Sequence, residues 1–178
     1  METFGTLTLR RALDHADLLA APVRDALASW EHAGEVLVAE IDPALADTAA
    51  MSEAYEVPLE SSANCVGVMG RRDGEERAAA CVVRADTRAD VNNVVKRTLD
   101  VRKASFLNHD RAVAETGMEY GGITPIGISP HWRLFVDPAV TDIETAIIGS
   151  GIRGSKLFLP GALLGRLPRA EVIAELAR

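Results

Sequence analysis

Apolar and polar residues alternate with two different periods along this chain, which predicts both helices and strands. Val23, Leu27 and Trp30 recur at the spacing of one helical face, after Pro22 at a first helical position. Shorter apolar runs bounded by turn residues predict strands. The predicted strands are 36–41, 64–69, 78–83, 103–107, 133–136, 146–148 and 155–159, and the predicted helices are 22–32, 42–55, 90–99, 110–116 and 160–167. Residues 1–20 show a poor pattern, and the type of 171–177 stays open.

The order of these elements mixes hairpins with helices, which predicts an α+β fold with a mixed sheet. A charged turn over residues 70–76 separates two of the strands and indicates an antiparallel hairpin. If its register pairs positions that sum to about 146, Cys65 and Cys81 face one another. The chain has 178 residues and no linker or repeat, so we expect one domain over residues 1–178, with 1–34 as an N-terminal extension packed on it.

The stretch from Tyr120 to Gly127 contains three glycines and one proline in eight residues. Glycine permits backbone angles that other residues avoid and lets another group approach the main chain, whereas Pro125 stiffens the segment. We therefore expect a stiff loop with exposed N–H and C=O groups that can line a pocket for a small polar ligand. A tight turn between two buried strands is the alternative interpretation.

A second glycine-rich stretch, Gly149 to Gly154, matches the pattern G-x-G-x-x-G. A dinucleotide site needs a helix directly after these glycines, so that the helix N-terminus meets the pyrophosphate. Here the chain continues with Ser155–Leu159, which reads as a strand and ends at Pro160. We therefore reject a nucleotide motif and expect either a second loop of exposed amides or a hairpin turn.

Composition narrows the function classes. The net charge of −7 argues against a protein that covers nucleic acid or an anionic membrane over much of its surface. No apolar run approaches the ~18 residues that span a bilayer, and no secretory signal precedes the first charged residues. We therefore expect a cytoplasmic protein with no membrane partner, in which both cysteines stay reduced.

Candidate side-chain chemistry is sparse. The two cysteines and the four histidines show no metal-ligand spacing, so we expect neither a metal nor a cofactor. No serine lies in a nucleophile elbow, and no pair of carboxylates suggests acid–base catalysis. Residues 71–103 carry nine basic and six acidic residues, a local excess of positive charge in an acidic chain. That segment is either a salt-bridged surface or a contact for a few phosphates.

The segment Glu119–Gly127, followed by a strand that ends at Asp137 and then by Gly151-Ile152-Arg153-Gly154, resembles the YbaK/prolyl-tRNA synthetase-associated domain family. These proteins are aminoacyl-tRNA editing domains and free-standing deacylases. The likeness is clearest over residues 64–172. It implies a compact α+β fold around a mixed, partly barrel-like sheet flanked by helices. It also implies hydrolysis of the ester that joins a wrong amino acid to the 3′-terminal adenosine of a tRNA.

The resemblance also implies the site. The tRNA acceptor end is the expected partner, and an aminoacyl-tRNA synthetase is a second candidate partner. Backbone groups of the glycine–proline loop hold the ester in this family, and fixed dipoles rather than acid–base side chains place the water. The residues so assigned are Asn64, Gly121 and Thr124 as catalytic, and Gly122, Ile123, Pro125, Gly127, Gly149, Ser150, Gly151, Arg153 and Lys156 as substrate-binding.

One position departs from the family pattern. The family usually carries a lysine at the start of the strand before the hairpin, where this chain reads Ser61-Ser62-Ala63-Asn64-Cys65. Asn64 can orient a water or a carbonyl, but it supplies no charge. Lys156, or an arginine of residues 71–103, is a candidate source of that charge. The alternatives to a deacylase are therefore a catalytically inactive member that binds tRNA, a synthetase or a small ligand, and a hydrolase of another small ester or amide.

Overall fold

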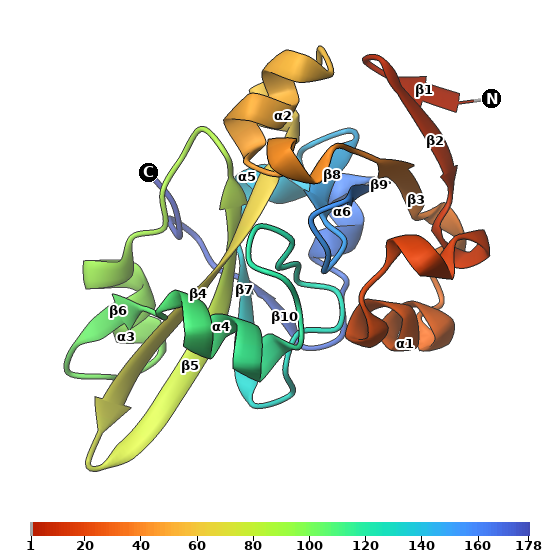
Figure 1. Cartoon of the computed structure of the whole chain (residues 1–178). Coiled ribbons are helices and arrows are strands. Elements are labelled where there is room, and N and C mark those ends of the chain that lie inside the picture. Colours follow the sequence, from red (N-terminus) through yellow and green to blue (C-terminus); the bar gives the residue numbers. More distant parts are fainter. Residues whose placement is uncertain (1) are drawn as a thin grey trace.

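The computed structural model describes residues 2–178, whose strands form two five-stranded sheets with short helices around them (Figure 1). The first sheet is antiparallel, has the order β1-β2-β3-β9-β8 and consists of β1 (Glu2–Phe4), β2 (Leu7–Arg11), β3 (Leu37–Glu40), β8 (Ala146–Gly149) and β9 (Ser155–Leu159). The second sheet is mixed, has the order β10-β7-β5-β4-β6 and consists of β4 (Ala63–Arg72), β5 (Glu75–Arg84), β6 (Ala104–Phe106), β7 (Trp132–Val136) and β10 (Ala170–Val172). The predicted α+β class is confirmed, and the strands form two open sheets without closing a barrel.

The helices are short and lie between the strands in sequence. They are α1 (Ala21–Ser29), α2 (Thr48–Ala54), α3 (Lys96–Thr98), α4 (His109–Thr116), α5 (Pro138–Thr141) and α6 (Gly161–Leu164). A π-helical turn, Val91–Val95, leads into α3, and the Asp90 carboxylate caps it by accepting a hydrogen bond from Asn93 N. In the described residues no helix is long and apolar enough to cross a bilayer.

The two sheets share one hydrophobic core. Val38 and Leu157 of the first sheet belong to the same buried cluster as Val82 and Leu134 of the second. A second cluster lies on the other face of the second sheet, where Val94, Val95 and Leu99 pack on β4, β5 and β7. The predicted buried face of residues 90–99 is therefore confirmed.

The β4–β5 hairpin is confirmed, and its register differs by one residue from the pairing that would bring the two cysteines face to face. Cys65 pairs with Val82, and Val66 pairs with Cys81, so paired positions sum to 147. The turn has only two residues, Asp73 and Gly74, both with positive φ (51° and 83°), as hairpins with a tight turn prefer. Because side chains alternate across a strand, the two cysteines point to opposite faces of the sheet and do not meet.

The predicted helix over residues 42–55 is broken at Ala46. Asp42 caps a 3-10 turn, Pro43–Leu45, by accepting a hydrogen bond from Ala44 N. Asp47 then starts α2 by accepting hydrogen bonds from Ala49 N and Ala50 N. The carbonyl of Ala46 is thereby left outside a helix and available to a side chain from elsewhere.

Residues 2–20, which showed little pattern, contain β1 and β2. Leu7 and Leu9 alternate inward from β2 and are buried. Several hydrogen bonds tie the segment to the rest of the chain: Ser155 Oγ donates to Leu18 O at 2.6 Å, Ala20 N donates to Ser150 O at 3.1 Å, and Ala12 N donates to Val36 O at 3.0 Å. We expect one domain over residues 1–178, with residues 1–34 packed on it as an extension. Met1 lies outside the described residues, and this expectation stays a prediction.

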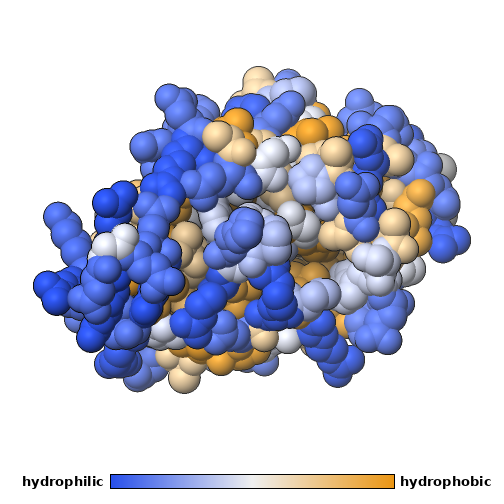
Figure 2. Space-filling model, turned by 90° about the horizontal axis from the view of Figure 1, so that it is seen from below, coloured by the Kyte–Doolittle hydropathy of each residue, from blue (hydrophilic) through white to orange (hydrophobic). Residues whose placement is uncertain are grey.

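Hydrophilic residues cover much of the face in Figure 2, most densely at its left end. In Figure 1 the same side of the molecule carries the tip of the β4–β5 hairpin and α3. Five of the nine basic residues of 71–103 are paired with acids. Arg72 and Arg77 both contact Asp100, Arg84 contacts Asp86, and Arg71 lies 3.6 Å from Glu76. This favours the interpretation of the segment as a salt-bridged surface.

Candidate active site

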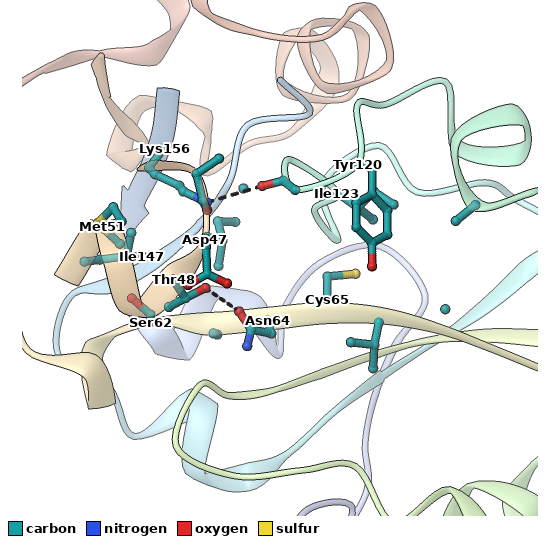
Figure 3. Close-up of a pocket in the computed structure, with 18 of the residues that line it drawn as sticks. Asp47, Thr48, Met51, Ser62, Asn64, Cys65, Tyr120, Ile123, Ile147 and Lys156 are labelled. Carbon is teal, nitrogen blue, oxygen red and sulfur yellow. Dashed lines mark hydrogen bonds between the residues drawn. The ribbon is translucent and has the colours of Figure 1, made fainter. Parts of the chain in front are cut away.

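A cavity of about 370 Å³ lies where both sheets meet α2 and the glycine–proline loop. Its wall combines segments that are distant in sequence, as Figure 3 shows for the residues it labels. The lining residues that carry the argument below are Asp47, Thr48, Met51, Ser62, Asn64, Cys65, Phe106, Tyr120, Gly121, Ile123, Ile147, Gly149 and Lys156. The cavity has the size of a small-molecule site.

Lys156 is the cation of this cavity. It projects from β9, is only 6% exposed, and donates through Nζ to Ala46 O at 3.1 Å and to Gly121 O at 3.5 Å. Burial lowers the pKa of Lys156 to about 8, with a further contribution from the positive charge of Arg153, whereas Asp47 opposes the shift. The break before α2 therefore supplies the carbonyl that holds this ammonium group.

Asn64 faces Lys156 across the cavity, from the start of β4. Its Oδ1 accepts a hydrogen bond from Thr48 Oγ1 at 2.9 Å, which fixes the orientation of the amide (Figure 3). Asp47 precedes Thr48 and adds a carboxylate to the same wall. The site thus combines a cation, an anion and an amide within one cavity.

The two glycine-rich bends touch each other beside the cavity. Gly151 N donates to Gly122 O at 2.7 Å, and a Cβ added at Gly149 would lie 2.3 Å from the same oxygen. Gly121, Ile123 and Gly149 line the cavity. Main chain from both bends therefore lines the same cavity.

Several predicted site residues do not reach the cavity. Thr124 is fully buried with an unpaired hydroxyl, and Gly122 is packed against Ile152. Pro125 and Gly127 line a different hollow, of about 210 Å³, next to Trp30. The loop turns inward after Ile123. Residues 124–127 therefore pack into the interior or against the second hollow, and they do not line the cavity.

Three predicted substrate-binding residues of the second bend, Ser150, Gly151 and Arg153, also lie outside the cavity lining. Ser150 is buried, and its Oγ donates to Ser155 O and lies 2.7 Å from Ser155 Oγ. A Cβ on Gly151 would meet Ala20 at 2.3 Å, so this glycine faces the N-terminal segment. Arg153 donates to Tyr120 O at 3.1 Å and to Pro43 O at 3.0 Å. These residues hold the bends in place and do not line the cavity.

The cavity has a closed end and an open end. Ser62, Met51 and Ile147 form the closed end and are between 1% and 2% exposed. Phe106 and Tyr120, which are 59% and 52% exposed, form the rim. The Tyr120 ring stacks on the His109 ring at a centroid distance of 4.1 Å.

Cys65 lines the cavity as an inert thiol. Burial, and secondarily the nearby Cys81, raise the pKa of the Cys65 thiol far above its usual range. It therefore stays protonated at neutral pH and does not act as a nucleophile. In residues 2–178 no group of three or more His, Cys, Asp or Glu side chains is placed to hold a metal ion.

Several lining residues were not predicted from the sequence, notably Asp47, Thr48, Ser62 and Tyr120. Asp47 was detectable, since an Asp-Thr pair before an alanine run is a helix-capping signal. Ser62 and Tyr120 carried no signal of their own, because only the packing of distant segments places them at the cavity.

Comparison with known proteins places this geometry in context. Residues 42–167 match the family model described as the aminoacyl-tRNA editing domain. A proline–tRNA ligase of Listeria welshimeri is 29% identical over 103 residues, and one of Listeria monocytogenes is 30% identical over 103 residues. Both matches cover 57% of this chain, which spans only 17% of the length of each ligase.

Two solved structures share the fold. A candidate trans-editing enzyme for prolyl-tRNA synthetase matches with a TM-score of 0.71 and 16% identity, covering 88% of this chain and 97% of its own. A scaffold protein used for computational epitope grafting matches with a TM-score of 0.73 and 17% identity, covering 87% of this chain and 95% of its own. At these identities the likeness supports the fold alone.

Proposed function

The chain belongs to the aminoacyl-tRNA editing domain family, and on that premise we propose that it hydrolyses the ester between a wrongly attached amino acid and the 3′ end of a tRNA. The observation that carries this proposal is the buried ammonium group of Lys156 in the cavity wall, held by two carbonyls. It supplies the positive charge that the sequence lacks at Asn64.

Lys156 has a defined role in this proposal. Attack of water on the ester carbonyl places negative charge on the carbonyl oxygen, and a fixed cation in a desolvated site stabilises that charge strongly. The main chain of Gly121 and Gly149 lies in the cavity wall, where its backbone groups can hold the ester. Asn64, oriented by Thr48, holds the water or the ester carbonyl by hydrogen bonding.

The shape of the cavity orients the substrate. A tRNA is too large to enter, so its terminal adenosine stays at the open rim, near the exposed ring of Tyr120. The amino acid then points to the closed end. Asp47 lies on the wall between these ends and is suited to pair with the α-ammonium group of the amino acid.

Proline tRNA is the first candidate substrate, because the matching curated relatives are proline–tRNA ligases. The test is to incubate the whole chain with proline tRNA charged with alanine, cysteine, serine, threonine or proline. We expect the protein to release at least one of the wrong amino acids faster than spontaneous hydrolysis does. Absence of turnover for every wrong amino acid at micromolar protein would rule out a deacylase of this tRNA.

A non-catalytic binding protein is the second candidate function, and the replacement of the usual family lysine by Asn64 favours it. It predicts saturable, salt-sensitive binding of tRNA without turnover. The same preparations distinguish the two functions, since binding and release of the amino acid are measured separately.

A further inference from the structure

Ser62 places an unpaired hydroxyl at the closed end of the cavity. The residue is 2% exposed, and its Oγ has no hydrogen-bond partner among residues 2–178. Its backbone is fully engaged: Ser62 N donates to Leu59 O at 3.0 Å, and Ser62 O accepts from Ala85 N at 2.8 Å. The position is therefore fixed by the main chain, while the side chain is free to serve a ligand.

Two apolar side chains lie next to this hydroxyl at the closed end. Met51 and Ile147 flank it, both almost completely buried (Figure 3). Ser62 also forms a β-bridge with Ile147, which fixes the two side by side. A buried polar group without a partner is unfavourable, and native proteins rarely keep one without a reason.

We propose that Ser62 reads the side chain of the amino acid and makes the site prefer a hydroxyl-bearing residue, serine or threonine, over alanine. This inference rests on the proposed function and on the orientation that puts the amino acid at the closed end. A substrate hydroxyl completes the hydrogen bond of Ser62, whereas the methyl group of alanine leaves it unpaired. Sites that hydrogen-bond a substrate group reject the analogue without it more effectively than apolar sites reject an extra group.

The test compares serine and alanine on the same tRNA. We expect the intact protein to release serine with a kcat/KM about 10-fold higher than alanine, the factor that corresponds to one net hydrogen bond. In Ser62→Ala this preference disappears, because the rate for serine falls about 10-fold while that for alanine is unchanged or higher.

Ser52→Ala is the matched control. Ser52 Oγ is also buried without a partner, but Ser52 does not line the cavity. We expect Ser52→Ala to keep the preference for serine. Neither substitution should lower the midpoint of thermal unfolding, because each removes an unpaired buried hydroxyl.

A second measurement separates this inference from the proposed function. Adenosine carrying serine or alanine through a 3′-amide cannot be hydrolysed as an ester, so its affinity is measured without turnover. Tighter binding of the seryl compound, lost in Ser62→Ala, supports the role of Ser62 even if no tRNA is deacylated. Equal affinity for both compounds, or a preference that persists in Ser62→Ala, overturns it.

Discussion

Lys156 combines nearly complete burial with a positive charge, an arrangement that ordinarily destabilises a fold. Its hydrogen-bond partners, Ala46 O and Gly121 O, are neutral carbonyls. The lowered pKa of about 8 expresses the same imbalance, since solvent would stabilise the charged form better than the protein does. A group kept in such surroundings is a candidate for function rather than for stability.

Replacing Lys156 with methionine tests this interpretation. Methionine fills a similar volume without charge, so we expect kcat/KM for a misacylated tRNA to fall about 100-fold, as for loss of one group that stabilises an oxyanion. The free energy of unfolding at pH 7 should not fall, because the burial of a charge is removed. Single-turnover deacylation and urea unfolding measure the two effects. Lys103→Met, at an exposed lysine, is the control; equal rates for both variants and the intact protein would exclude the role.

The pH dependence of stability follows from the same residue. The pKa of Lys156 is lower in the folded protein than the usual 10.5, so the unfolded chain binds more protons between pH 8 and 10.5. The contribution of Lys156 to the free energy of unfolding therefore rises with pH across this range, by up to about 3 kcal/mol. We expect the difference between intact protein and Lys156→Met to shift in favour of the intact protein from pH 7.5 to 9.5. A difference that does not change with pH would contradict a lowered pKa.

At the scale of elements, the contact between the two glycine-rich bends depends on missing side chains. A Cβ at Gly149 would lie 2.3 Å from Gly122 O, a distance that the backbone must relieve by moving. Gly154 lies a few residues along in the same connection, where a Cβ would meet only Pro43 Cγ at 3.8 Å. Alanine substitutions at Gly149 and Gly154 therefore form a matched test and control.

Gly149→Ala should destabilise the protein and push the two glycine-rich bends apart beside the cavity. We expect a loss of about 2 kcal/mol in the free energy of unfolding, the usual effect of overpacking, together with reduced deacylation. Gly154→Ala should change both quantities little, since its new methyl group makes an ordinary contact. Chemical denaturation and initial rates provide the measurements. Similar losses in the two variants would show that the bends do not need this close approach.

Most elements were predictable because local signals and packing agree. Asp90 caps the π-helical turn as an N-cap should, and Gly117 ends α4 with a left-handed φ of 67°. The register of the hairpin follows from its turn: Asp73-Gly74 is a two-residue hairpin signal, and pairing the residues on either side of it gives the observed sum of 147. The break at Ala46 was missed because Asp42 and Asp47 are both good caps, and the pattern alone did not show that each starts its own turn.

At the scale of the whole molecule, the site exists only where the two sheets come together. Asn64 comes from the second sheet, Lys156 and Gly149 from the first, and Thr48 from α2. The sequence motifs indicated the two bends but not which of their residues face inward. That choice depends on long-range packing, such as the 2.7 Å hydrogen bond from Gly151 N to Gly122 O. Lys156 was identified as one possible cation, and its burial could not be inferred from sequence.

Phe106 lies on the edge strand β6 and lines both the cavity and a further hollow of about 440 Å³, which also includes the exposed Arg88. The single-stranded 3′ end of a tRNA that leaves the cavity rim in this direction would pass over the Phe106 ring and towards Arg88. Aromatic rings that stack on bases beside positive charges are the usual components of single-strand binding sites.

Phe106→Ala therefore tests how the tRNA end leaves the cavity. If Phe106 stacks on a nucleotide that precedes the terminal adenosine, the substitution should raise KM for misacylated tRNA about 10-fold, the typical loss of one stacked base, and leave kcat nearly unchanged. KM for the same amino acid on adenosine alone should not change, because that substrate lacks the stacked base. Val172→Ala is the control, since Val172 is similarly exposed on β10, at the opposite edge of the sheet. An equal rise in KM for both substrates would place the terminal adenine itself on Phe106, and no rise for either would direct the strand elsewhere.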